Sequence, residues 1–115
     1  MEIFAKDNKL KAALENEAIC KKRFGAPMSR KLTARLAVLQ AAESLAAFWP
    51  PNSGPERCHE LKCDLAGTFS IDLKQPYRLL FRPIEETPAK DRSNEQERWC
   101  SITAIEVLGI EDTHG

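Results

Sequence analysis

The chain has 115 residues, of which 43% are apolar and 30% are charged. This composition excludes an intrinsically disordered chain and predicts one globular domain, residues 1–115, that can bury a core of its own. Seventeen basic residues balance seventeen acidic ones, so the net charge does not point to a nucleic-acid partner. The distribution is uneven, because residues 1–40 carry nine basic and four acidic residues, whereas residues 84–115 carry three and eight. A polyanion would therefore prefer the N-terminal half.

No apolar segment approaches membrane-spanning length and no signal-peptide pattern precedes the domain, so the sequence predicts a cytoplasmic protein without a membrane partner. The cytoplasm is reducing, and the four cysteines are then expected to be free thiols: Cys20, Cys58, Cys63 and Cys100. A zinc site built from Cys58, His59 and Cys63, completed by Cys100 or His114, is an alternative. Its spacing differs from the common zinc motifs, and we expect neither a metal nor another cofactor.

The N-terminal segment predicts a short edge strand at Ile3 and Phe4, followed by a helix that begins at Asp7 or Asn8. Apolar residues at helical spacing extend this helix toward residues 21–23: Leu10, Ala13, Leu14 and Ile19. The basic residues of its last turn suit the negative end of the helix dipole. Gly25 then provides a stop, because glycine adopts the left-handed conformation readily.

A second helix is predicted to open at Pro27 with Ser29 as its N-cap. Its apolar stripe is formed by Leu32, Leu36, Leu39, Ala42, Leu45 and Ala46. The opposite face carries Arg30, Lys31 and Arg35. These cations form either an ordinary solvated helix face or a ledge that binds phosphates. Three prolines and a glycine within residues 49–55 then predict a loop.

The central stretch, residues 57–83, predicts a short extended segment around His59 and Lys62, a turn, and two strands. In the first strand, residues 68–73, Phe69, Ile71 and Leu73 alternate with Ser70 and Asp72, which is typical of a strand buried on one face. The second strand, residues 77–82, places Arg78 and Arg82 on one face. An arginine there can hold an anion, or Arg78 can pair with Asp72 across the hairpin.

The polar segment 84–98 has no periodicity and predicts a long, mobile hairpin loop. Residues 99–110 are apolar on both faces, as expected for a central strand covered on both sides. The predicted fold class is therefore α+β, with two N-terminal helices packed on one face of a small antiparallel sheet of three to five strands.

Three segments resemble the RelE/ParE toxin superfamily, and most closely its branch of HigB-like plasmid-maintenance killer proteins. They are CHELKCDLAGTFSIDL at residues 58–73, YRLLF at 77–81 and IEDTHG at 110–115. The resemblance implies a RelE-like fold over nearly the whole chain. It also implies a toxin that cuts messenger RNA on the translating ribosome, held inactive by an antitoxin, often a HigA-like protein with a helix-turn-helix domain.

RNA is cleaved without metal when its 2′-hydroxyl attacks the adjacent phosphate, which requires a base, an acid and cations on the phosphorane. Both histidines of the chain, His59 and His114, lie in the matched segments and can divide the acid and base roles. Asp112 can orient His114 or act as a base. The candidate cations for the phosphate and the RNA are Arg78, Arg82, Lys62, Arg30 and Arg35. Each of these residues also has an ordinary alternative as a surface side chain or part of a frayed terminus.

The chain departs from the family pattern at two positions. Relatives commonly end in Asp-Tyr-His, but here Thr113 replaces the tyrosine and cannot stack on a base. Relatives also commonly have glycine where this chain has Cys63, which matters if the turn requires a positive φ. Two alternatives to the ribonuclease therefore stay open: a ParE-like toxin that inhibits DNA gyrase, and an inactive member that only binds its antitoxin.

For the antitoxin, the expected contact surface is the basic helical half, with Lys21, Lys22, Arg23, Arg30 and Arg35. The same cations can instead face ribosomal RNA.

Overall fold

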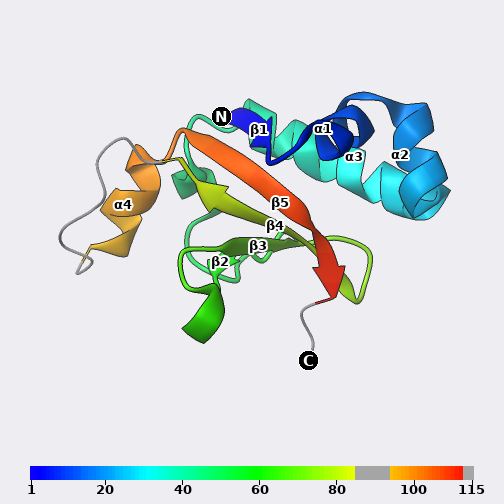
Figure 1. The fold of residues 1–115 in the computed structure, drawn as a ribbon. Helices are drawn as coiled ribbons and strands as arrows, with labels where there is room; N and C mark the ends of the chain where they lie inside the picture. Colours follow the sequence, from blue (N-terminus) through cyan, green and yellow to red (C-terminus); the bar gives the residue numbers. More distant parts are fainter. Residues whose placement is uncertain (85–93, 113–115) are drawn as a thin grey trace.

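A computed structural model of the chain describes residues 1–84 and 94–112 (Figure 1). The helical half contains a first strand and three helices: β1 (Glu2–Ala5), α1 (Asn8–Glu15), α2 (Glu17–Phe24) and α3 (Ala26–Ala41). Short 3₁₀ helices, η1 (Leu45–Phe48) and η2 (Cys63–Leu65), flank β2 (His59–Glu60). The chain continues through β3 (Phe69–Asp72), β4 (Tyr77–Pro83), α4 (Glu95–Ser101) and β5 (Ala104–Asp112).

The five strands form one sheet in the order β1-β5-β4-β3-β2, which places β1 at an edge as expected. The antiparallel expectation is correct for four strands but wrong for β1, which runs parallel to β5. The reason is the connection: the helices α1 to α3 separate β1 from the rest of the sheet and supply the long crossover that a parallel pair needs. In Figure 1 these three helices lie together on one side, and α4 lies at the other end of the molecule.

The first predicted helix is two helices. Asp7 caps α1 as expected, because its side chain accepts a hydrogen bond from the Leu10 amide at 2.8 Å. The helix then ends at Asn16, whose side-chain oxygen accepts hydrogen bonds from the amides of Ala18 and Ile19 and caps α2. Asparagine competes with the helix in this way because its side chain satisfies free amides, and a periodicity pattern does not register such a break.

Gly25 ends α2 with a φ of +86°, so the expected stop is confirmed. The expectation that Ser29 caps the next helix is wrong, since α3 begins at Ala26 with Gly25 as its N-cap and a proline in its first turn. Ser29 is buried within α3 instead. The apolar stripe also ends earlier than predicted, because α3 stops at Ala41 and Leu45 belongs to η1.

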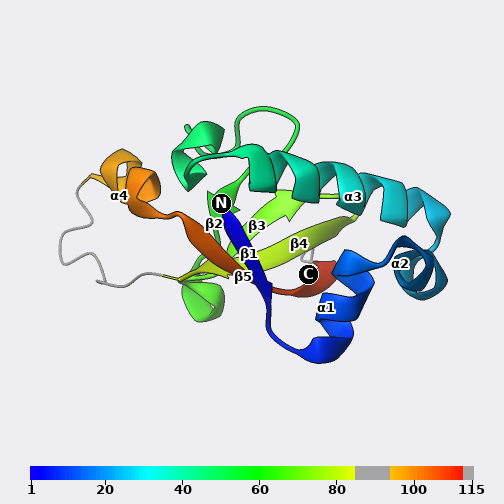
Figure 2. The same cartoon turned by 90° about the horizontal axis from the view of Figure 1, so that it is seen from above.

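The core lies between α3 and one face of the sheet, and Figure 2 shows α3 running across that face. The ring of Phe69 is central to it, with Phe81 at 5.8 Å and Trp99 at 5.6 Å between ring centroids. The other fully buried side chains include Leu32, Leu39, Leu45, Ile71, Leu79, Ile102, Ile105 and Val107. Their burial supplies the main favourable free energy of folding and fixes which face of the sheet remains available for a site.

The predicted 84–98 hairpin loop is partly wrong. Residues 95–98 are helical, because α4 begins at Glu95 with Asn94 as its cap, whose side-chain oxygen accepts from the Glu97 amide at 3.0 Å. Residues 85–93 lie outside the described part of the chain. Trp99 is likewise in α4 rather than in a strand, and β5 starts at Ala104. The buried face of α4 consists of Arg98 and Trp99 only, which is too short an apolar pattern to predict a helix.

Within residues 1–84 and 94–112, no helix is both long and apolar enough to span a membrane.

Candidate functional site

The sheet register brings residues from β2, β3, β4 and β5 to the face opposite the core. Side chains of directly paired residues lie on the same face of a sheet, and successive residues alternate between faces. His59 pairs with Ser70, which pairs with Leu80, and two residues further along Asp72 pairs with Arg78. Phe69 and Ile71 occupy the core face, so this second face carries His59 and Arg78, about 10 Å apart across the strands and about 7 Å along them.

Asp72 is the last residue of β3, and its carboxylate contacts three side chains on this face. Its carboxylate is 3.5 Å from Arg78 Nε and 4.0 Å from Arg57 Nε, and it accepts a hydrogen bond from Gln75 Nε2 at 3.4 Å. The Arg78 and Asp72 side chains are 13% and 8% exposed. The pairing of Arg78 with Asp72 that the sequence offered as the ordinary alternative is therefore present in the structure. The prediction that this strand is buried on one face only is wrong, because Ser70 and Asp72 on its other face are buried as well.

The main chain of Asp72 is held as firmly as its side chain. Its amide donates to the Glu56 carbonyl at 2.7 Å, and its carbonyl accepts from Arg35 Nε at 2.9 Å. Arg35 also donates through Nη2 to the Pro55 carbonyl at 3.2 Å. Arg35 thus connects α3 to β3 and to the segment before β2. Its expected place on an exposed cationic ledge is wrong, because its long side chain turns inward and satisfies buried carbonyls.

His59 is half-buried in β2, and its Nδ1 lies 2.7 Å from the Arg57 carbonyl oxygen. A carbonyl oxygen only accepts hydrogen bonds, so Nδ1 must carry the proton in this contact. In the neutral ring the lone pair is then on Nε2, which makes Nε2 the atom of His59 that can accept a proton from a ligand.

The remaining expected site residues are spread over the molecule. Arg82 is 61% exposed and pairs with Glu106 at 2.8 Å. Lys62 is exposed at the start of η2, and Arg30 is exposed on α3, the layer that covers the opposite face of the sheet. Lys62 follows His59 closely in the sequence, whereas α3 places Arg30 on the opposite side of the sheet from this face.

Asp112 is the last residue of β5 and is exposed. It pairs with Tyr77, and the preceding residue Glu111 pairs with Arg78. By alternation, Glu111 rather than Asp112 lies on the face of Arg78. His114, the expected partner of Asp112, lies outside the described residues.

Two residues that contribute to this face were missed from the sequence as site residues: Asp72 and Arg57. Asp72 appeared only as a possible partner of Arg78. Arg57 carried no signal at all, because its position depends on a backbone φ of +48°, which a non-glycine residue rarely adopts. Cys63 has a φ of +59°, so the turn does require a positive φ where relatives commonly have glycine.

The thiol of Cys58, next to His59, is fully buried. Burial, with a smaller effect from the nearby Glu56 carboxylate, raises the pKa of Cys58 to about 12. A thiol that stays protonated is a poor nucleophile. In the described ranges no three histidine, cysteine, aspartate or glutamate side chains lie close enough to hold a metal ion.

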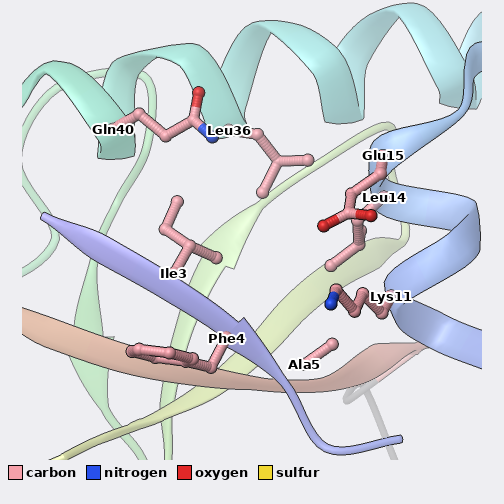
Figure 3. A pocket seen from close by; sticks show the side chains of 8 residues that line it. All are labelled: Ile3, Phe4, Ala5, Lys11, Leu14, Glu15, Leu36 and Gln40. Carbon is pink, nitrogen blue, oxygen red and sulfur yellow. The ribbon is translucent and has the colours of Figure 1, made fainter. Parts of the chain in front are cut away.

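A separate groove of about 290 Å³ opens between β1, α1 and α3 (Figure 3). Ile3, Leu14 and Leu36 point into it, and Lys11 and Glu15 lie at its edge. This lining suits an apolar side chain rather than a phosphate, so the groove and the His59 face differ in the chemistry they can bind.

No protein-family model matches the sequence, and no curated protein matches it significantly. A solved structure does resemble it along its whole length. This is the YoeB/ParE toxin from Agrobacterium tumefaciens, with a TM-score of 0.57, 15% sequence identity, and coverage of 99% of this chain and 100% of that one. The chain has the fold of a YoeB/ParE toxin. The expected RelE-like α+β fold is thereby confirmed, whereas an identity of 15% carries only the fold.

Proposed function

We propose that this chain is the toxin of a toxin–antitoxin system and cuts messenger RNA on the ribosome by metal-independent acid and base catalysis. The observation that supports this most directly is the pair of His59 and Arg78 on one sheet face, with His59 Nε2 left as the proton acceptor by the Nδ1 contact to Arg57. The similarity of the fold to that of a YoeB/ParE toxin also supports the proposal.

In the proposed reaction His59 Nε2 accepts the proton of an RNA 2′-hydroxyl, whose oxygen then attacks the adjacent phosphorus. Arg78 stabilises the negative charge that develops on the phosphorane, a task for which a guanidinium held in place by Asp72 is already oriented. His114 donates a proton to the leaving 5′-oxygen, and Asp112 orients it. Lys62 and Arg82 contact the RNA on either side of the cut.

A ParE-like toxin that inhibits gyrase without cutting RNA is the second candidate. The charge balance of the site favours it, because Asp72 and Glu111 both flank Arg78 and reduce the attraction of this face for a polyanion. An inactive chain that only binds its antitoxin is the third, and Thr113 in place of tyrosine supports it. Under all three, the partner is a cognate antitoxin, for which a HigA-like helix-turn-helix protein is our proposal.

The test is induced expression in a bacterial host, with growth and messenger RNA 5′ ends recorded together for wild type, His59→Ala, His114→Ala and the distant surface variant Lys9→Gln. We expect arrest and new 5′ ends for wild type and Lys9→Gln. For each histidine variant we expect cleavage to fall by at least about 100-fold, because each removes a general acid or base. Ribosome-bound cleavage with purified proteins gives the rates.

Each other outcome selects a competing function. Arrest that survives both histidine substitutions without new 5′ ends would indicate gyrase or another protein target. Absence of arrest in every strain, with soluble toxin present, would leave only the antitoxin-binding function.

A further inference from the structure

Arg57 has an uncommon backbone conformation next to the candidate base. Its φ is +48°, and its amide donates to the Ser53 carbonyl at 3.2 Å, which holds the turn before β2. This conformation directs the Arg57 carbonyl oxygen to His59 Nδ1 at 2.7 Å. A non-glycine residue rarely adopts this region, and such strain is concentrated at functional sites.

The side chain of Arg57 reaches the same face. Its Nε is 4.0 Å from Asp72 Oδ2, and its side chain is 54% exposed, whereas Arg78 is only 13% exposed on the other side of the same carboxylate. Because this contact is long and the Arg57 side chain is more than half exposed, the ion pair is weak and Arg57 can exchange it for a better anion. A phosphodiester is such an anion, because a guanidinium donates two parallel hydrogen bonds to its oxygens.

We propose that Arg57 is an RNA-binding and positioning residue of this face. Its guanidinium moves from Asp72 to a phosphodiester oxygen of the bound strand, while its carbonyl keeps His59 in the tautomer with a free Nε2. The proposal rests on the proposed function in taking RNA as the ligand. Arg57 thus acts on both reactants. Its guanidinium positions the RNA phosphate so that the neighbouring 2′-hydroxyl lies at His59 Nε2, and its carbonyl keeps that nitrogen unprotonated.

The two contributions are separable by substitution. Arg57→Asn removes the cation but keeps the carbonyl, and asparagine is among the residues that best tolerate a positive φ. Arg57→Lys restores a cation without the planar fork. Lys9→Gln, in the exposed part of α1, removes one positive charge far from the face and serves as the matched control.

The experiment uses the full chain and a single-stranded RNA hexanucleotide with 2′-fluoro groups, which has phosphodiesters but no 2′-hydroxyl and so is not cleaved. Binding is followed by NMR on the arginine Nε–H signals, and nitrogen-15 imidazole shifts report the His59 tautomer. We expect the Arg57 signal to move on binding and His59 to carry its proton on Nδ1 in wild type and in Arg57→Asn alike.

For Arg57→Asn we expect about tenfold weaker binding of the hexanucleotide, because the variant loses one charge-assisted hydrogen bond to the phosphate. The slope of log affinity against log salt should decrease by about 0.7. Arg57→Lys should recover part of the affinity, and Lys9→Gln should bind within twofold of wild type. In ribosome-bound cleavage, Arg57→Asn should raise KM with an unchanged pH profile.

An Arg57 signal that does not move, wild-type affinity in Arg57→Asn, or His59 protonated on Nε2 would each overturn the proposal. These failures are distinct from failure of the nuclease function. Wild-type cleavage that Arg57→Asn retains in full would refute the role of Arg57 alone, whereas RNA binding at Arg57 without cleavage by wild type would refute the nuclease alone.

Discussion

At the scale of single residues, buried polar groups decide the geometry of the candidate site. The carboxylate of Asp72 holds Arg78, and its main chain is bound by Arg35 and by the segment at Glu56. Because the positive charge of a buried guanidinium must be paired with a negative charge, Asp72 and Arg78 maintain each other's orientation. Arg57, with a longer and more exposed contact to the same carboxylate, remains available to a ligand.

Cys58 gives the clearest residue-scale prediction. Burial raises its pKa from 9.0 to about 12, so the folded state holds the proton more tightly than the unfolded state. This contribution to the free energy of unfolding is complete below pH 9 and is lost as the pH rises from 9 toward 12. We expect urea unfolding at a series of pH values to show a shallower alkaline decrease for Cys58→Ala than for wild type.

Alkylation of the native protein provides the companion measurement. The exposed Cys63 and Cys100 should react with iodoacetamide, while the buried Cys20 and Cys58 should stay unmodified until the chain unfolds. Equal alkaline slopes, together with rapid labelling of Cys58, would contradict the burial of this thiol.

At the scale of elements, α4 stabilises the short edge strand that carries His59. Arg98 of α4 has a side chain only 3% exposed, and its Nη1 donates to Glu60 Oε1 at 2.8 Å. Its guanidinium also lies 5.6 Å from the centre of the Phe69 ring. Glu60 in turn accepts from the Gly67 amide at 2.9 Å, so one partly buried ion pair joins α4, β2 and the turn before β3. A two-residue strand has little pairing of its own and depends on such contacts.

Arg98→Met should therefore lower the free energy of unfolding by about 3 kcal/mol, because it removes the buried cation that faces Glu60. The double variant Arg98→Met with Glu60→Gln should recover part of this loss, and a double-mutant cycle from urea unfolding measures the coupling. Glu95→Gln is the control, since Glu95 is 35% exposed and lies 3.4 Å from Arg98. Additive losses in the cycle would refute the ion pair as the link between α4 and β2.

At the scale of the whole molecule, the charge asymmetry of the sequence is only partly available to a partner. Lys21, Lys22 and Arg23 are exposed in the last turn of α2, and Arg30 is exposed on α3. Arg35 is excluded from this surface by its burial. Arg30 lies on α3, which covers the sheet face opposite His59, and α2 packs mainly against α1 and α3 (Figure 2). We therefore expect an antitoxin segment bound to these cations to leave the His59 face open.

We expect the combined reversal Lys21→Glu, Lys22→Glu and Arg23→Glu to weaken binding of the cognate antitoxin at least about tenfold at low salt. The difference from wild type should shrink as salt increases, because these side chains are exposed and screened. Calorimetric titration at several salt concentrations measures this effect, with Lys74→Glu in the β3–β4 turn as the control. Unchanged low-salt affinity, with the fold intact, would place the antitoxin elsewhere.

The sequence alone was enough to predict the fold class, the edge strand β1 and the central strands β3 and β4, and its resemblance to a toxin family selected His59 and Arg78. These follow from local periodicity, turn residues and short motifs, which report what each segment does on its own. The burial of Arg35 and Asp72, the interruption of the expected loop by α4, and the place of Arg57 at the site became visible only in the folded chain. The physical reason is that these features depend on contacts between distant segments, such as Arg35 with Asp72 and Pro55. A polar side chain becomes favourable in the interior only when another part of the chain supplies its hydrogen-bond partner.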